Sequence, residues 1–285
     1  MTSVPLPHPV TGQPFLSPVP PGTGWPSDPA SPGTEVAHDA AAVVRLAADA
    51  DLAELEARMS VCRACPRLVT WREDVARDKR ASFAGEPYWG RPIHGWGDDD
   101  ARVLVVGLAP AANGGNRTGR IFTGDRSGDW LFASLHRVGL AAQPTSVHAG
   151  DGQRLIGTRM AAAVRCAPPA NKPTPQERDA CAPWLHRELT LIADSLRVVV
   201  CLGSFGWDAA LRALRATGHD VPRPKPRFGH AAEVLIGAPR GSGDPVTLLG
   251  SYHPSQQNTF TGTLTEPMLD AVLGRAASLA GLSRG

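Results

Sequence analysis

The chain has 285 residues, 42% of them hydrophobic, and a formal net charge of +2. This is enough for one large or two small domains, and no apolar run approaches the roughly 18 residues that a membrane span needs. The first residues, MTSVPLPHPVTGQPF, lack the charged region and apolar stretch of a secretory signal. Together these features exclude a membrane-spanning or exported chain of the usual kinds, and we expect a cytoplasmic protein.

The N-terminal segment is rich in proline, since ten of the 27 prolines lie within the first 34 residues. A segment of this composition buries too little apolar surface to offset its ordering entropy. We therefore predict a disordered tail over residues 1–34 and a single domain over 35–285. Residues 35–60 are rich in alanine and leucine, which predicts helix.

From residue 102 onward, short apolar runs alternate with helical patterns. The predicted strands are 102–107, 159–166, 197–203 and 246–255. The predicted helices are 127–140, 174–192, 204–217 and 266–282. Thr174, Pro175 and Glu177 form a capping box with proline at the first helical position. The alternation predicts an α/β fold, a three-layer α/β/α sandwich around a four-stranded, largely parallel sheet.

A glycine-rich loop, GLAPAANGGNRTGRIFTGD at residues 107–125, follows the first predicted strand. In a parallel sheet, ligands bind beyond the carboxyl ends of the strands, so this loop is placed to contact one. It is not a phosphate loop, because no lysine follows its glycines, and it does not contain G-x-G-x-x-G. We therefore expect no nucleotide cofactor.

The cysteines indicate a metal centre. Cys62 and Cys65 form a C-x2-C pair, and Cys166 and Cys181 bracket a 14-residue, proline-rich segment. Disulfides are disfavoured in a chain without an export signal, whereas four thiolates can hold zinc or an iron–sulfur cluster. Spacing alone does not decide between the two. Cys201 lies within the apolar run VVVCL, which predicts a core thiol.

Three loops and the cysteines together carry a family resemblance. The loops are GLAPAANGGNRTGRIFTGD, RCAPPANKP and SYHPSQQNTF, each after a predicted strand. With the four cysteines, they resemble the uracil-DNA glycosylase superfamily, and within it family 5, the B-type enzymes with an iron–sulfur cluster. The resemblance covers about residues 55–275. Families 1 and 4 carry an acidic residue in the first loop, whereas no carboxylate occurs here between Gly107 and Gly115, as in family 5.

The resemblance implies a monofunctional DNA repair glycosylase. Such an enzyme flips out uracil, and other deaminated or damaged bases such as hypoxanthine or ethenocytosine, and hydrolyses the N-glycosidic bond to leave an abasic site. It implies a structural [4Fe–4S] cluster on Cys62, Cys65, Cys166 and Cys181. It also implies a monomer that acts on damaged DNA, duplex and single-stranded, at the nucleoid within the cytoplasm, without a membrane partner.

The resemblance also assigns roles to residues. Phe122 stacks on the base, and the amide of Asn171 pairs with the O4/N3 edge of uracil. His253 donates a hydrogen bond to O2 of the departing base. Asp125 stabilises the cationic sugar, positions water or acts as a base, and these roles stay open. Gly107, Leu108, Ala109, Pro110 and Ala111 are expected to contact the base, with loop amides around Gly107 to Ala112 as donors.

DNA contacts are expected outside the pocket. Arg117 and Arg120 are expected to meet phosphates. The segment QQNTF, with Gln256 and Asn258, is expected to enter the groove and fill the gap left by the flipped base.

Two other readings stay open at this point. A family 4-like uracil glycosylase is disfavoured by the missing acidic residue after Gly107 and by the presence of Asp125. A non-catalytic iron–sulfur protein that binds DNA and senses damage or redox state would keep its DNA affinity without Asp125 and His253. Each site residue also has an ordinary structural explanation. Asp125, for instance, is a suitable N-cap for the helix that begins near Ser127.

Overall fold

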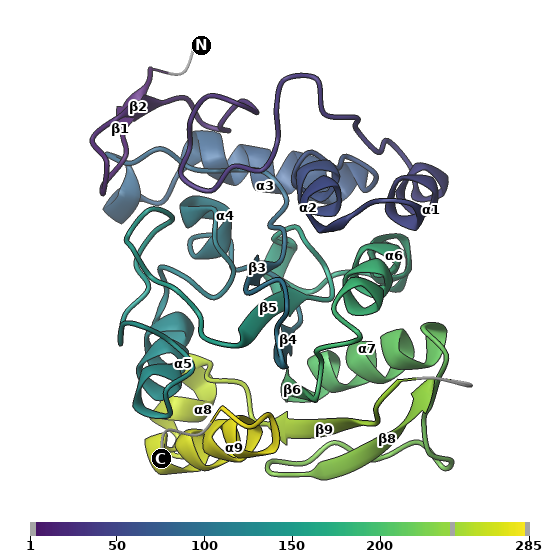
Figure 1. The fold of residues 1–285 in the computed structure, drawn as a ribbon. Coiled ribbons are helices and arrows are strands. Elements are labelled where there is room, and N and C mark those ends of the chain that lie inside the picture. Colours follow the sequence, from purple (N-terminus) through teal and green to yellow (C-terminus); the bar gives the residue numbers. More distant parts are fainter. Residues whose placement is uncertain (1–3, 240–242, 283–285) are drawn as a thin grey trace.

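The computed structural model describes residues 4–239 and 243–282, and a mostly parallel sheet lies at its centre (Figure 1). Four neighbouring strands run parallel in the order β5-β4-β6-β9. Their bounds are β4 Val103–Gly107, β5 Thr158–Ala162, β6 Val198–Leu202 and β9 Val246–Ser251. The four predicted strands are therefore confirmed, and their carboxyl ends meet at one edge of the sheet.

Within the described residues, the sheet has seven strands rather than the four expected from sequence. The additional strands pair antiparallel at its two edges, β3 on β5, β8 on β9 and β7 on β8. They are β3 Trp96–Gly97, β7 His219–Asp220 and β8 Glu233–Pro239. Two of them are only two residues long, and β8 is largely accessible to solvent. The strands β3 and β7 are too short for a sequence pattern to detect. Strand β8 contains the apolar run VLI at 234–236 and buries Ile236 in the core, but this run was not assigned to a strand from the sequence.

Helices cover both faces of the sheet, in agreement with the predicted sandwich (Figure 1). On one face, Val103 and Val105 of β4 pack with α5 Arg126–Arg137 and α9 Glu266–Leu279. On the other face, Leu104 and Val106 pack with α6 Pro175–Leu191 and α7 Gly203–Ala216. Successive side chains of a strand point to opposite faces, so one apolar run supplies both cores. The predicted capping box of α6 is present.

The remaining helices precede the sheet or lie in its loops. Instead of one helix over 35–60, the chain forms two, because Asp51 caps a new helix with Glu54 in a capping box. The remaining bounds are α1 Ala40–Ala48, α2 Leu52–Ser60, α3 Pro66–Asp78, α4 Gly115–Thr118, α8 Gln256–Phe260 and the 3₁₀ turns η1 Ala81–Phe83 and η2 Pro169–Asn171. No helix in residues 4–239 and 243–282 is long and apolar enough to cross a membrane.

The proline-rich segment is packed against the domain, which corrects the expected disordered tail for residues 4–34. It contains a short hairpin, β1 Leu6–Pro7 with β2 Pro14–Phe15, and buries Phe15 and Trp25 in the main core. Asp28 forms a buried ion pair with Arg91 at 2.8 Å. Composition predicts disorder only if the segment must supply its own core, whereas its aromatic side chains fill a core that the domain supplies.

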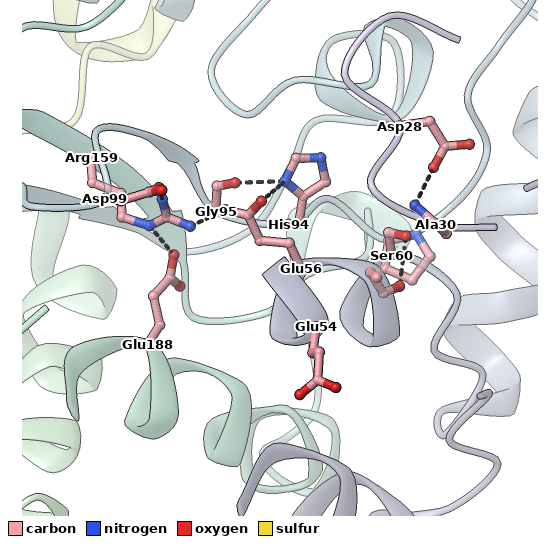
Figure 2. A network of polar contacts seen from close by, with 12 residues as sticks. Asp28, Ala30, Glu54, Glu56, Ser60, His94, Gly95, Asp99, Arg159 and Glu188 are labelled. Carbon is pink, nitrogen blue, oxygen red and sulfur yellow. Dashed lines mark hydrogen bonds and ion pairs between the residues drawn. The ribbon is translucent and has the colours of Figure 1, made fainter. Parts of the chain in front are cut away.

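A buried ionic network joins the helical N-terminal part to the sheet (Figure 2). At its centre, Arg159 of β5 donates from Nε to Glu188 of α6 at 2.7 Å and also pairs with Glu56 of α2. The other oxygen of Glu188 accepts from Arg165 at 2.5 Å. Burial pushes the pKa of Glu188 upward, but Arg165 and Arg159 together hold it below its usual value. Glu188 is therefore a charged group whose burial depends on its two arginines.

Replacing Glu188 by alanine should lower the free energy of unfolding by about 3–5 kcal/mol, because Arg159 and Arg165 would remain buried without their shared partner. Urea denaturation at pH 7 measures the change. The matched control is Glu35→Ala, which removes an exposed ion pair with Arg45 and should cost at most about 1 kcal/mol. Equal losses for the two variants would contradict this interpretation of the network.

Candidate active site

A cavity of about 600 Å³ opens at the carboxyl ends of β4, β6 and β9. The segments that directly follow these three strands form most of its wall. Asn171 adds to it from the connection after β5, and Phe228 from the segment before β8. The lining includes Leu108, Ala109, Pro110, Ala111, Phe122, Asp125, Asn171 and His253, all of them predicted site residues. The predicted contact residues from three loops, separated by up to 145 positions, thus meet around one space.

Phe122 and Gly107 are packed against each other at the base of this cavity. A Cβ atom on Gly107 would lie 2.6 Å from Cζ of Phe122, so only glycine leaves room for the ring. Phe122 is almost fully buried and has a φ of 52°, a left-handed conformation that is strained for a non-glycine residue. The lack of a side chain at Gly107 therefore makes room for the ring of Phe122. The left-handed backbone of Phe122 fixes that ring at the cavity.

Asp125 has a structural role and a place in the cavity at the same time. It is the N-cap of α5, where its Oδ1 accepts a hydrogen bond from the backbone N–H of Gly128 at 2.9 Å. Burial raises the pKa of Asp125 above its usual value, opposed by backbone hydrogen bonds and by Arg117. A Cβ on Gly114 would collide with the other oxygen, Oδ2. The helix cap therefore orients the carboxylate toward the cavity.

His253 lines the cavity from the loop after β9. Burial lowers its pKa to about 4, so the imidazole is neutral at pH 7. Its loop is held by Asn258, whose side-chain amide donates to the backbone carbonyl of His253 at 2.8 Å. A neutral imidazole can donate one N–H to a ligand. His253 lines the same cavity as the carboxylate of Asp125. Such a pair can stabilise developing charge of both signs.

Asn171 is exposed at the cavity rim in the turn η2. It and Ala170 both have left-handed backbones, with φ of 55° and 52°. Arg67 of α3 anchors this segment, since it donates to the carbonyl of Lys172 at 3.2 Å and pairs with Glu177 at 2.7 Å. Arg67 was not predicted from sequence, because its partners lie more than 100 positions away.

Several other residues that line the cavity were not predicted from the sequence. They include Ser127, Ser204, Phe205, Phe228, Tyr252 and Gln257. Ser204 and Phe205 directly follow the third predicted strand, so the rule that ligands bind at strand carboxyl ends pointed to them. Phe228 had no such signal, because it precedes the unpredicted edge strand β8.

The expected phosphate contacts of Arg117 and Arg120 are wrong. Both side chains are almost fully buried and form ion pairs inside the protein. Arg117 pairs with Glu86 and Arg120 with Asp151, each at 2.7 Å. Their guanidinium groups hold the glycine-rich loop in shape and are not available to a phosphate outside.

The segment 256–260 forms the short helix α8 beside the cavity. Asn258 lines the cavity while its amide binds the carbonyl of His253, and Gln256 is exposed. Insertion of this segment into DNA stays a prediction.

The four predicted ligand cysteines lie together around a small separate cavity, which Arg72 also lines. All are free thiols, and burial raises the pKa of Cys65 to about 12 and that of Cys62 and Cys181 in the same direction. No group of three or more His, Cys, Asp or Glu side chains in the part of the chain that the structure describes is arranged to hold a metal ion. Cys201 is fully buried in the core, as predicted.

The donor set nevertheless fits a thiolate-bound centre in its chemistry. Four sulfur atoms from α6 and two loops surround one space, and two of them accept hydrogen bonds. Arg72 donates to Sγ of Cys166 at 2.9 Å, and the N–H of Arg165 donates to Sγ of Cys181 at 3.3 Å. Hydrogen bonds of this kind stabilise thiolates that bind a metal.

Comparison with known proteins places these features in a family context. Residues 94–276 match the family model described as the uracil DNA glycosylase superfamily. A type-5 uracil-DNA glycosylase of Mycobacterium tuberculosis is 57% identical over 276 residues, which is 96% of this chain and 99% of that protein. A type-5 uracil-DNA glycosylase of Thermus thermophilus is 50% identical, over 79% of this chain and 96% of its own. A type-4 uracil-DNA glycosylase of Archaeoglobus fulgidus is 27% identical over 57% and 70%.

Proposed function

Because the chain belongs to the uracil-DNA glycosylase superfamily, with type-5 relatives over most of its length, we propose that it excises uracil from DNA and leaves an abasic site. It is a monofunctional hydrolase of N-glycosidic bonds in base excision repair. The observation that carries the proposal is the meeting of Phe122, Asp125, Asn171 and His253 at one cavity. These residues come from the loops after β4, β5 and β9, and each supplies a group that this reaction uses.

The cavity binds the extruded base. Phe122 presents its ring for stacking, and the exposed amide of Asn171 pairs with the O4/N3 edge, for which it has both a donor and an acceptor. Backbone N–H groups of residues 107–109 and 111 contribute further hydrogen bonds. The cost of unstacking the base is offset by these contacts, which only an extruded nucleotide can reach.

Breaking the N-glycosidic bond separates charge. His253 and Asp125 stabilise the two opposite charges that develop. The sugar acquires oxocarbenium character and the base leaves as an anion. His253 is neutral and donates its N–H to O2 of the base. Asp125 faces the sugar as a carboxylate, where it stabilises the cation, positions water or accepts the proton of that water.

The proposal includes a wider range of bases, among them hypoxanthine and ethenocytosine. The first loop contacts the base without a carboxylate, since none occurs between Gly107 and Gly115. A cavity of about 600 Å³ is large enough for a purine base. Backbone amides discriminate less sharply than a side chain that matches a single edge.

The four clustered cysteines hold a structural [4Fe–4S] cluster in this proposal. Four cysteine thiolates are the usual ligands of such clusters, although zinc uses the same donor set. Bound there, the cluster would carry no step of base release. It would tie the loop after Cys62 to the segment between Cys166 and Cys181, which carries Asn171.

Base release from oligonucleotides with a single uracil tests the proposed function. We expect alkali-labile cleavage at the uracil in duplex and single-stranded DNA, cleavage at hypoxanthine as well, and a monomer by gel filtration. Asn171→Ala should lower kcat/KM for uracil by about 10- to 200-fold, since one base-edge contact is worth about 1–3 kcal/mol. The control is the exposed neighbour substitution Gln176→Ala. No release by intact protein from any of these substrates would refute the enzyme and favour the DNA-binding sensor.

The metal centre has its own prediction. The purified protein should absorb visible light and contain iron and acid-labile sulfide in equal amounts. Cys65→Ser should remove this absorbance and lower the melting temperature, because one of four ligands is removed. Cys201→Ala should keep the absorbance, since that thiol lies in the core away from the other four. A colourless protein that contains zinc would show that the site is a zinc site instead.

A further inference from the structure

Three exposed cations lie next to lining residues of the cavity: Arg126, Lys172 and Arg227. Each is the immediate chain neighbour of a residue that lines the cavity, so its Cα lies about 3.8 Å from that of a lining residue. They belong to three different loops: the start of α5, the end of η2 and the connection before β8. The fold therefore brings the three cations to the same cavity, and they do not belong to one basic stretch of sequence.

None of the three cations has an ion pair within 4.0 Å or a side-chain hydrogen bond among residues 4–239 and 243–282. The side chain of Arg126 lies over the exposed ring of Phe260, 4.5 Å from its centroid. Some exposed arginines are held in ion pairs, for example Arg137 with Asp270 and Arg275 with Glu233. The three cations beside the cavity are thus available to an anion from outside.

The cavity and its charged rim match different parts of a nucleotide. The cavity lining presents aromatic and amide side chains that suit a base, while three segments that border it each carry an exposed positive charge. Arginine and lysine side chains are common phosphate ligands, and phosphate contacts fix the register of a protein on DNA. The buried Arg117 and Arg120 cannot supply these contacts.

We propose that Arg126, Lys172 and Arg227 bind the DNA phosphates that flank the extruded nucleotide. Because they belong to three different segments beside the cavity, together they hold the DNA backbone next to it while the base enters. This inference rests on the proposed function, because it assumes that the cavity receives a base still attached to DNA.

Salt dependence of DNA binding tests the inference without any catalytic readout. The triple variant Arg126→Gln, Lys172→Gln and Arg227→Gln is compared with wild type by fluorescence anisotropy on a duplex with a tetrahydrofuran abasic analogue. For each duplex phosphate that the variant no longer neutralises, the slope of log K against log salt should fall in magnitude by about 0.9. For three phosphates, wild-type affinity should therefore decline about 40-fold more than that of the triple variant between 50 and 200 mM KCl.

The matched control is Arg154→Gln. Arg154 is exposed, has no ion pair among the described residues, and precedes β5, at the opposite edge of the sheet. Its slope should equal that of wild type. An unchanged slope in the triple variant, or an equal reduction in the control, would overturn the inference. A reduced slope in the triple variant of a protein whose wild type releases no base would refute the proposed function and leave the phosphate contacts established.

Discussion

Replacing Asp125 by asparagine should lower the single-turnover rate of uracil release by about 10²- to 10⁴-fold and leave the protein as stable as the wild type. Asparagine caps a helix about as well as aspartate, so the bond to the N–H of Gly128 can persist while the negative charge is removed. Asp125→Ala should lose the same activity and also about 0.5–2 kcal/mol of stability, because the cap is removed.

The two variants separate the structural role of Asp125 from its chemical one. Asp39 provides the matched control, since it caps α1 through Ala42 away from the cavity. Asp39→Ala should lose stability without losing rate. If Asp125→Asn releases uracil at the wild-type rate, the residue is a helix cap only and the proposed role is wrong.

The reaction should also depend on pH through Asp125. Burial raises its pKa, so the carboxylate gains a proton at a higher pH than an exposed aspartate does. If the charged form is the active one, wild-type rates should decline as the pH falls into this raised range. The decline should be absent from the residual activity of Asp125→Asn, which single-turnover rates across pH would show.

Replacing His253 by alanine should lower the rate by about 10²- to 10³-fold, because a preorganised donor to the departing base is removed. His253→Gln, which keeps an N–H donor, should recover part of this loss. The exposed His38 is the control, and its replacement should leave the rate unchanged. A His253→Ala variant with wild-type rates would show that the base leaves without this hydrogen bond.

The charge state of His253 provides a second measurement. Since burial lowers its pKa to about 4, its ring should gain a proton only as the pH falls through about 4. NMR titration of the ring should therefore show a midpoint far below the ordinary value of about 6.5. A midpoint near 6.5 would show that burial does not hold the ring neutral, and a cationic imidazole would then contribute to the reaction at pH values below about 6.5.

Much of the architecture could be predicted because its signals are local. The four parallel strands are apolar runs buried on both faces, and α6 begins at the predicted capping box. Both features depend on residues a few positions apart, which the sequence displays directly. The candidate site was predictable for a related reason: in a parallel sheet, loops that follow different strands meet at one edge, whatever their separation along the chain.

The features that the sequence did not determine depend on distant partners. From the sequence, Arg117 and Arg120 were expected to be exposed DNA contacts. In the fold they pair with Glu86 and Asp151, which lie 31 positions away in each case. The proline-rich segment orders because Trp25 enters a core built by other residues. The two-residue edge strands β3 and β7 depend on backbone pairing with strands distant in the chain. Local patterns thus determined the secondary structure and the site loops, whereas only the tertiary structure decided which charges are buried and which remain free to meet DNA.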